Sequence, residues 1–364
     1  MKYADIEGLG KKDQFKKGLV DFLRPTAKNL SKHGIGIVPE SLGEPAALLD
    51  FIDYDFYLAF KTDGVGTKSL IADKMAEAVR KGKKFKGKIW QLYAGLGIDL
   101  VASNVNDLIC LGAKPIALSD EISAGDYRVF TDPDRMKGLF GSLKKGCLES
   151  EITIPCGESP TLTDIVNKKA ISITGSSIGL IRPKSKAVFG QKLKAGDVIY
   201  GLASSGIHTN GLSLARKIVE KMPEGYFTPF GKKTVGEELL TPTRIYTKIV
   251  MEMMEKQVEI HYMSNISGSA FRKIMRAKKD FTYVIEKLPR RPRILKYLTK
   301  LHNIPDYEAY ETWNMGLGFV FFAPENQEKK LFDISKKHKV KVYKLGWVER
   351  GPRKVVIRPL GLTY

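Results

Sequence analysis

Apolar and polar residues alternate along two stretches of the first half of the chain, residues 55–61 and 170–181. A period of two is typical of strands with one buried face. In three other stretches the apolar residues recur every three or four positions. This spacing predicts helices over residues 69–80, 90–112 and 133–149.

Shorter segments complete the first half. Helical spacing predicts a helix within residues 13–34, and the glycines and the proline of residues 34–39 indicate a flexible connection. Residues 114–121 have the composition of a strand that delivers two acidic residues at its end. A short strand is expected over residues 151–155.

A polar segment with a proline, Arg182–Lys186, lies at the midpoint of the chain and predicts a domain boundary. We therefore expect an N-terminal domain over residues 1–182 and a C-terminal domain over residues 183–364. In the second half, the same patterns predict strands near 197–202, 281–286, 315–323 and 340–348 and helices near 212–222, 242–256, 268–278 and 325–338. Strands followed by paired helices in each half favour an α+β fold over strict βαβ alternation.

The segment Thr62–Lys68 follows the first predicted strand and holds a carboxylate, two glycines, a hydroxyl and a lysine. Gly64 and Gly66 let the backbone turn with positive φ and approach a ligand closely. Asp63 offers a hard anionic oxygen and Lys68 a mobile positive charge, which together suit a polyphosphate bound with Mg²⁺. Because the spacing matches neither a Walker A loop nor a GxGxxG turn, a simple tight turn is the alternative.

Four polar residues of the predicted helix over residues 90–112 recur at i, i+4, i+7 and i+8 and share one face: Asp99, Ser103, Asn106 and Asp107. Apolar residues occupy much of the rest of this helix. Two carboxylates on such a helix are costly to bury unless they meet a charged partner. A metal ion held between the helix and Asp63 would meet that need, and a solvent-facing stripe is the alternative.

The composition is that of a globular protein of about two domains. Hydrophobic residues make up 43% of the 364 positions, which is enough for a sizeable core. We expect no membrane span, because no apolar run of about 18 residues occurs, and no secretory signal, because residues 1–7 contain no apolar region. Three cysteines without metal-site spacing favour reduced thiols and a cytoplasmic location.

The net charge is +20, and the 60 lysines and arginines are spread along the whole chain. The densest cluster, Arg80–Lys88, is expected to be a loop between two helices. Nucleic-acid binding is one explanation for such an excess. A solvated basic surface, or attraction for phosphorylated substrates, explains it as well. Since the charge is dispersed, we do not expect nucleic acid to be the main partner.

Five motifs, in order along the chain, resemble those of the phosphoribosylformylglycinamidine cyclo-ligases, also called aminoimidazole ribonucleotide synthetases. They are Asp63–Lys68, Gly97–Pro115, Gly201–Gly211, Leu240–Tyr246 and Trp313–Gly316. The resemblance covers about residues 50–350. The third motif, with its SSGIHTNG core, is the most specific to the family.

The resemblance implies a two-domain fold of the aminoimidazole ribonucleotide synthetase type. An N-terminal sheet-and-helix domain would bind ATP and Mg²⁺ and pair in a homodimer, and a C-terminal α+β domain would bind the substrate. The implied reaction uses ATP to close formylglycinamidine ribonucleotide into 5-aminoimidazole ribonucleotide. It proceeds through a phosphorylated amide and also yields ADP and phosphate.

The resemblance also implies roles for individual residues. Catalytic roles fall to Asp63, Lys68, Asp107 and Glu158, of which Asp63 and Asp107 would hold the metal. Nucleotide contacts fall to Gly64, Gly66, Thr67, Asp99, Asn104 and Asn106, and substrate contacts to Ser204, Ser205, His208, Asn210 and Arg244. As alternatives, Asp99 could be a helix cap or a buried partner, and Arg244 could form an ion pair between domains.

Two segments depart from the family pattern. Cys156–Thr161 keeps the Glu158 carboxylate of a Gly-Gly-Glu-Thr motif, but the loop after it differs. Asn265–Ala270 stands where the family has His-Ile-Thr-Gly-Gly-Gly, so that Asn265 replaces a histidine. These departures leave open another phosphoryl acceptor, as in the related selenophosphate synthetases and thiamine-monophosphate kinases. A non-catalytic, RNA-associated relative is a third alternative, supported only by the charge.

Overall fold

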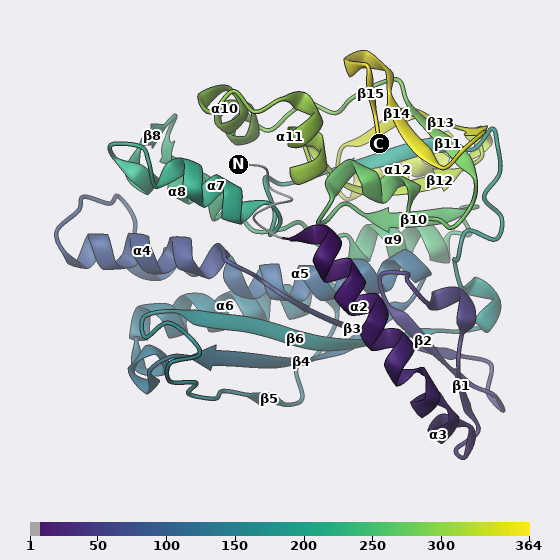
Figure 1. Ribbon diagram of the computed structural model, residues 1–364, viewed down its shortest axis with the longest axis horizontal. Coiled ribbons are helices and arrows are strands. Elements are labelled where there is room, and N and C mark those ends of the chain that lie inside the picture. Colours follow the sequence, from purple (N-terminus) through teal and green to yellow (C-terminus); the bar gives the residue numbers. More distant parts are fainter. Residues whose placement is uncertain (1–7) are drawn as a thin grey trace.

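The computed structural model describes residues 8–364, except the side chains of residues 9, 10 and 13, and shows two mixed halves stacked on one another (Figure 1). Each half contains one large sheet with helices packed on it, so the predicted α+β class is confirmed. The expectation that residues 1–7 carry no secretory signal lies outside the described residues.

The first sheet has six strands in the order β1-β2-β3-β6-β4-β5. They are β1 (Ile35–Ile37), β2 (Ala47–Phe51), β3 (Tyr57–Gly64), β4 (Lys114–Ala124), β5 (Gly157–Glu158) and β6 (Ile171–Ile181). The long strands β3, β6 and β4 are antiparallel neighbours. In β6 every buried residue alternates with a more exposed one, as the sequence pattern predicts, whereas β4 ends in three consecutive buried residues.

Three helices cover one face of this sheet: α4 (Lys68–Arg80), α5 (Leu96–Leu108) and α6 (Pro133–Ser150) (Figure 1). The side chain of Asp132 caps α6 by accepting from the backbone N–H groups of Asp134 and Arg135. At the N-terminal end, α2 (Leu9–Leu23) is followed by a 3₁₀ turn (Arg24–Ala27) that contains Pro25 and by α3 (Lys28–Ser31).

The second sheet has seven strands in the order β10-β12-β7-β13-β11-β14-β15. Strands β8 and β9 form a separate two-stranded hairpin. The strands are β7 (Val198–Ala203), β8 (Pro229–Phe230), β9 (Lys233–Thr234), β10 (Tyr262–Asn265), β11 (Phe281–Ile285), β12 (Leu317–Ala323), β13 (Val342–Arg350), β14 (Lys354–Ile357) and β15 (Leu362–Thr363). The helices are α7 (Leu212–Val219), α8 (Val235–Leu239), α9 (Thr247–Glu255), α10 (Arg293–Leu301), α11 (Asp306–Thr312) and α12 (Glu328–Lys337).

Several predicted elements were wrong in kind or extent. Residues 34–39 are not only a connection, because they include β1. Residues 151–155 form a single bridge at Thr153 rather than a strand. The helix expected over 268–278 is a 3₁₀ turn, Ala270–Met275. The helix expected over 242–256 begins only at Thr247, because the preceding backbone N–H groups of Thr243 and Tyr246 donate to side chains of the first half.

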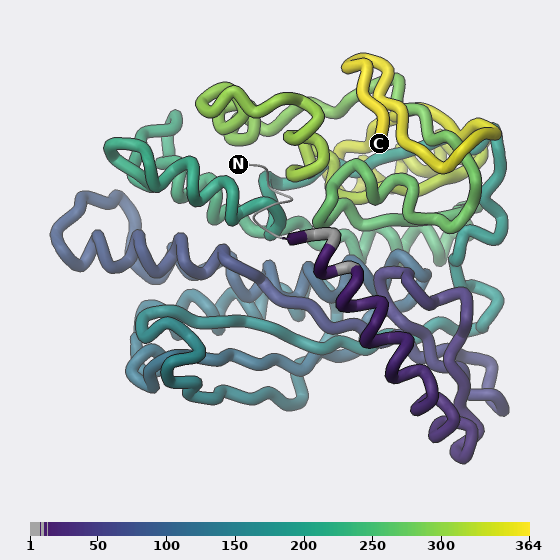
Figure 2. The backbone as a smooth tube through the Cα atoms, in the orientation of Figure 1, coloured from purple at the N-terminus to yellow at the C-terminus, as the bar shows by residue number. Residues whose placement is uncertain are grey.

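Helix α5 lies between the first sheet and the second half of the chain, as the path of the backbone in Figure 2 shows. Its residues Ile98, Val101 and Val105 pack with Ile245 of the second half. By length and composition the stretch Ile89–Leu111 could cross a membrane, yet 89% of its most apolar window is buried inside the protein. That burial is the property of a core helix, and it makes α5 the common support of both halves.

A buried ion pair at the start of α4 is hydrogen-bonded to the second half of the chain. The ammonium of Lys68 lies 2.8 Å from one carboxylate oxygen of Asp99 on α5, and both side chains are fully buried. The same ammonium donates to the backbone carbonyl of Thr241 at 2.6 Å. Asp99 in turn accepts from the backbone N–H and the hydroxyl of Thr243 at 2.8 and 2.6 Å. Burial lowers the pKa of Lys68, and the charge of Asp99 opposes this shift.

Removing Lys68 should therefore destabilise the protein at the junction between the halves. Lys68→Met leaves the Asp99 carboxylate buried without its cation, which costs about 3–5 kcal/mol of unfolding free energy. Urea unfolding measures this loss. The matched control is Lys81→Met, which breaks the exposed Lys81–Glu77 pair and should cost at most about 1 kcal/mol. Equal stability of the two variants would contradict the structural role given to Lys68.

Candidate active site

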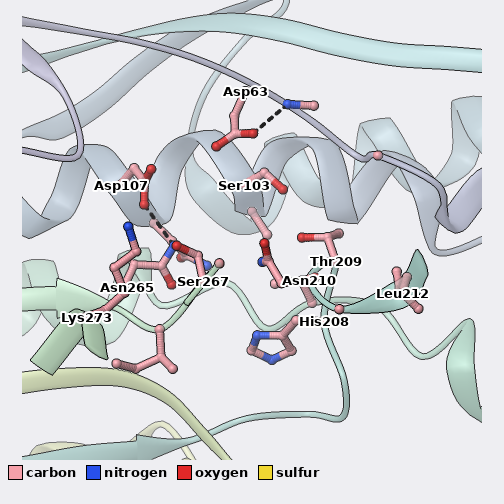
Figure 3. Close-up of a pocket in the computed structure, with 18 of the residues that line it drawn as sticks. Asp63, Ser103, Asp107, His208, Thr209, Asn210, Leu212, Asn265, Ser267 and Lys273 are labelled. Atoms are coloured by element: carbon pink, nitrogen blue, oxygen red, sulfur yellow. Dashed lines mark hydrogen bonds between the residues drawn. The ribbon is translucent and has the colours of Figure 1, made fainter. Parts of the chain in front are cut away.

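A cavity of about 440 Å³ lies between the two halves and takes residues from both. The first half contributes the end of β3, the turn after it and one face of α5. The second half contributes the loop before α7 and the segment after β10. Figure 3 shows Ser103 and Asp107 on α5 facing Asn210 and Asn265 across this space. The polar stripe predicted on this helix therefore faces the cavity and the second half rather than solvent.

Two carboxylates face one another at one end of the cavity. Asp63 ends β3, and Asp107 lies in the last turn of α5. One oxygen of Asp107 accepts from the side-chain amide of Asn265 at 2.9 Å. One oxygen of Asp63 accepts from the backbone N–H of Gly64 at 2.8 Å. These bonds fix both carboxylates and leave the second oxygen of each directed at the same cation, Lys61.

The ammonium of Lys61 lies 2.8 Å from Asp107 and 3.1 Å from Asp63. Burial alone would lower the pKa of Lys61, but the carboxylates of Asp107 and Asp63 outweigh it and raise the pKa. The sequence signal for this residue is its position: two residues before Asp63 on a strand, it must point to the same side of the sheet. Sequence reasoning did not use that signal.

The turn after β3 has the two glycines for different reasons. Gly66 has φ +65°, as predicted, and open space where a side chain would begin. Gly64 does not have positive φ. Instead, an added Cβ would lie 3.0 Å from the carbonyl oxygen of Ile173 on β6. With Thr67, these residues form a wall of the cavity from which backbone atoms can approach a ligand.

Positive charge exceeds negative charge around the cavity. Four cationic side chains line it, Lys16, Lys61, Lys273 and Arg276, against the two carboxylates. Within residues 8–364, the half-buried ammonium of Lys273 has no carboxylate partner within ion-pair distance. Burial, followed by the charge of Arg276, lowers the pKa of Lys273 to about 8. A half-buried ammonium without a carboxylate favours an anionic ligand.

The second half presents the loop before α7. His208, Thr209 and Asn210 line the cavity, and α7 begins beyond Gly211, which has φ +72°. His208 is buried, and burial lowers its pKa to about 3, so its imidazole is neutral at pH 7. Its Nε2 accepts from the backbone N–H of Ser205 at 3.2 Å. The histidine therefore shapes the loop, while Asn210 faces the cavity (Figure 3).

Eight residues assigned from the sequence line the cavity: Asp63, Gly64, Gly66, Thr67, Asn106, Asp107, His208 and Asn210. The amide of Asn106 is already used, because it donates to the carbonyl of Arg244 and accepts from the N–H of Tyr246. Lys68 and Asp99 do not line it and are held in the buried ion pair described above. Lys68 is thus not the mobile charge expected, because burial, the Asp99 carboxylate and the Thr241 carbonyl hold its ammonium.

The remaining assigned residues lie outside the cavity. Asn104 donates to the carbonyl of Leu100 within α5. The hydroxyls of Ser204 and Ser205 donate to Asn314 and to the carbonyl of Pro242, so they brace the loop. Arg244 accepts from Asn106 through its carbonyl, and no ion pair of its side chain occurs among the described residues. Glu158 is exposed on the edge strand β5 and accepts from the N–H of Ser159.

The arrangement suits a phosphorylated anion that brings a divalent cation with it. Mg²⁺ is commonly held by one or two carboxylates together with substrate phosphates and water. Asp63 and Asp107 supply that number, and among the described residues no cluster of three or more His, Cys, Asp or Glu forms a complete cage. The donor set therefore fits Mg²⁺ when phosphate oxygens complete the shell and Lys61 moves aside.

Comparison with protein families agrees with this architecture. Residues 43–181 match the model described as AIR synthase related protein, N-terminal domain, and residues 194–358 match its C-terminal domain. Among solved structures, the hydrogenase maturation protein HypE in complex with ATP has a TM-score of 0.57 at 17% identity, covering 84% of this chain and 83% of that chain. Thiamine-monophosphate kinase from Stenotrophomonas maltophilia has a TM-score of 0.58 at 16% identity, covering 94% and 96%. These two likenesses show the shared fold.

Curated relatives are more similar in sequence. The phosphoribosylformylglycinamidine cyclo-ligase of Methanocaldococcus jannaschii is 40% identical over 317 residues, which cover 86% of this chain and 83% of the relative. The protein of the same name from Pyrococcus horikoshii is 35% identical over 349 residues, covering 95% and 94%. With both family models matched along most of its length, the chain belongs to the phosphoribosylformylglycinamidine cyclo-ligase family.

Proposed function

We propose that this protein is an ATP-dependent ligase that converts formylglycinamidine ribonucleotide into 5-aminoimidazole ribonucleotide, ADP and phosphate. The observation that carries the proposal is the cavity between the halves, where two facing carboxylates lie within an excess of positive charge. Relatives at 35–40% identity bear the name of this activity. A metal-bound polyphosphate and a second phosphorylated substrate both suit such a cavity.

The chemistry has two steps. Transfer of the γ-phosphoryl group of ATP to the amide oxygen of the substrate releases ADP and turns a poor leaving group into a good one. An amidine nitrogen of the same molecule then attacks the activated carbon, the C–O bond breaks, and phosphate leaves as the nitrogen loses a proton. The protein has to neutralise charge on the transferred group and hold the substrate folded. Holding two groups in attack geometry can be worth about 7–11 kcal/mol.

In this proposal the first half, residues 1–182, holds the nucleotide. Asp63 and Asp107 would hold Mg²⁺, which supplies charge neutralisation on the phosphates. Gly64, Gly66 and Thr67 let backbone atoms approach the phosphates closely. Lys68 and Asp99 would not contact the nucleotide. Their ion pair instead fixes the start of α4 and the segment around Thr241.

The second half, residues 183–364, would hold the phosphate of the ribonucleotide. The side chain of Asn210 and the N–H groups at the start of α7 are suited to it, since a helix N-terminus favours anions. This loop contains no carboxylate, so it fits a bare phosphate better than a metal-bound one. The HypE and thiamine-monophosphate kinase likenesses leave the same fold open to other acceptors. Incubation with ATP and either formylglycinamidine ribonucleotide or thiamine monophosphate, with product analysis, decides between them.

We also propose a homodimer formed through the first sheet, in a cytoplasmic protein whose three cysteines are unpaired. Helices cover only one face of this sheet within the described chain (Figure 1). On the other face, the register places Leu58 beside Leu180 and Phe60 beside Ile178. Phe60 is 47% exposed. A second copy would cover this apolar face.

Asp107→Asn tests the metal assignment. The substitution keeps the shape of the side chain and removes its charge, so turnover at limiting Mg²⁺ should fall about 10²–10³-fold. Steady-state kinetics over a range of Mg²⁺ concentrations measure the effect. Asp333→Asn on the exposed surface of α12 is the charge-matched control and should react as the unmodified protein does. Normal turnover of Asp107→Asn at limiting Mg²⁺ would show that the α5 carboxylate is structural.

Asn210→Ala tests which half holds which substrate. Losing a hydrogen bond to a charged group costs about 1.5–3 kcal/mol, or roughly ten- to over a hundredfold. We expect that loss in the KM of the ribonucleotide, with the affinity for ATP nearly unchanged. Each substrate is titrated separately against the purified variant. Weakened ATP binding with unaltered ribonucleotide kinetics would mean that the nucleotide lies in the other half.

Phe60→Glu tests the dimer. A carboxylate in the centre of an apolar interface is costly to bury, so the variant should sediment as a monomer where the unmodified protein sediments as a dimer. Phe332→Glu on α12 is the matched control, because Phe332 is a similarly exposed phenylalanine of the second half and should leave the dimer intact. An unmodified protein that is monomeric and fully active at micromolar concentration would refute the proposal.

A further inference from the structure

Lys61 occupies the place that a metal bound to both carboxylates would need. Its ammonium contacts Asp107 at 2.8 Å and Asp63 at 3.1 Å, whereas Mg²⁺ binds oxygens at about 2.0–2.1 Å. The side chains of Lys61 and Asp107 are only 17% and 7% exposed, so solvent weakens that contact little, whereas Asp63 is 44% exposed. An ammonium and a metal ion cannot share the two oxygens. Binding of one therefore requires departure of the other.

The surroundings of Asp107 and Asp63 favour a cation between them. Asp107 is 7% exposed, and its other oxygen is held by the amide of Asn265. Without a cation, the two carboxylates would repel each other in a partly buried place. Lys61 removes that repulsion. Because β3 directs Lys61 and Asp63 to the same side of the sheet, the strand itself delivers this internal counter-ion.

Displacement of Lys61 by a metal alone would be unfavourable. The released ammonium would join Lys16, Lys273 and Arg276, which already line the same cavity. Among the described residues, only Arg276 of these three lies near a further carboxylate, that of Glu44 at 4.0 Å. A polyphosphate changes this balance, since it brings negative charge to all four cations. Binding of the metal and binding of the polyphosphate therefore strengthen one another. The metal replaces Lys61 at the carboxylates, and the polyphosphate accepts the released ammonium.

We propose that Lys61 is a positioning residue that keeps the metal position closed until a metal-bound polyphosphate arrives, and then turns to the phosphates. The inference rests on the proposed function for the identity of the ligand. Lys61 holds the two carboxylates in the absence of metal and couples metal binding to nucleotide binding. Free divalent cation binds weakly as a result.

Mn²⁺ is the probe, because the electron paramagnetic resonance signal of free Mn²⁺ measures how much of the ion remains unbound. The experiment uses the full-length protein and needs no turnover. In the absence of nucleotide, Lys61→Met should bind Mn²⁺ about tenfold more tightly, since the competing cation is gone. Lys61→Arg keeps that cation and should stay close to the unmodified protein. With a non-hydrolysable ATP analogue present, the gain in Mn²⁺ affinity caused by the nucleotide should be smaller in Lys61→Met.

The matched control is Lys273→Met, which removes one cation of the same cavity that touches neither carboxylate. Equal tightening in Lys61→Met and Lys273→Met would overturn the proposal, because it would reveal only a general charge effect. If Lys61→Met does not fold, Lys61→Gln replaces it. Adding Asp107→Asn to Lys61→Met should abolish the gain. If Asp107→Asn leaves tight Mn²⁺ binding unchanged, the metal does not bind at Asp107, and the metal site of the proposed function is refuted. This outcome differs from equal tightening in the two lysine variants, which would refute only the role of Lys61.

Discussion

The buried pair of Lys68 and Asp99 is the contact on which the cavity depends. It joins the start of α4 to α5 and, through Thr241 and Thr243, to the second half of the chain. Two charges without solvent require close geometry and additional hydrogen bonds to offset their desolvation. The Lys68 ammonium gains one such bond from the Thr241 carbonyl, and Asp99 gains two from Thr243. The segment from Thr241 to Tyr246 consequently stays outside α9, with the N–H groups of Thr243 and Tyr246 donating to side chains of α5.

Helix α5 carries that constraint into the site. Residues of its polar stripe have two roles on one face of the helix. Asp99 and Asn106 form hydrogen bonds with the second half, while Ser103 and Asp107 line the cavity. Its apolar residues pack against α6, the first sheet and Ile245. Because one helix makes both sets of contacts, the packing that joins the halves also positions the carboxylate of Asp107 in the cavity.

Acidic side chains occupy only one part of the cavity. The two carboxylates lie at the end where Lys61 and Asn265 contact them, whereas the loop with Thr209 and Asn210 has no acidic side chain. The departure from the family pattern at Asn265 also has a place in this arrangement, because its amide donates to Asp107. An amide at this position orients the carboxylate without adding a titratable group.

Much of this architecture could be predicted from the sequence, because short-range patterns determine it. Alternation over β3 and β6, helical spacing over α5 and α6, and the order of the five motifs led to the fold class, the family and eight residues of the cavity. Local glycine chemistry likewise predicted the turn at Gly66.

Only the tertiary structure decided what each polar side chain touches. Lys68 follows a glycine turn in a way that suits a phosphate contact, but packing of the second half on α4 buries it against Asp99. Ser204 and Ser205 look like phosphate donors in a glycine-rich loop, yet their hydroxyls meet Asn314 and Pro242, which are distant in sequence. Lys61, Lys273 and Arg276 form one cationic wall only because β3 and the 3₁₀ turn after β10 meet in space. A sequence pattern fixes the face on which a side chain lies, whereas its partner depends on which surfaces come together when the chain packs.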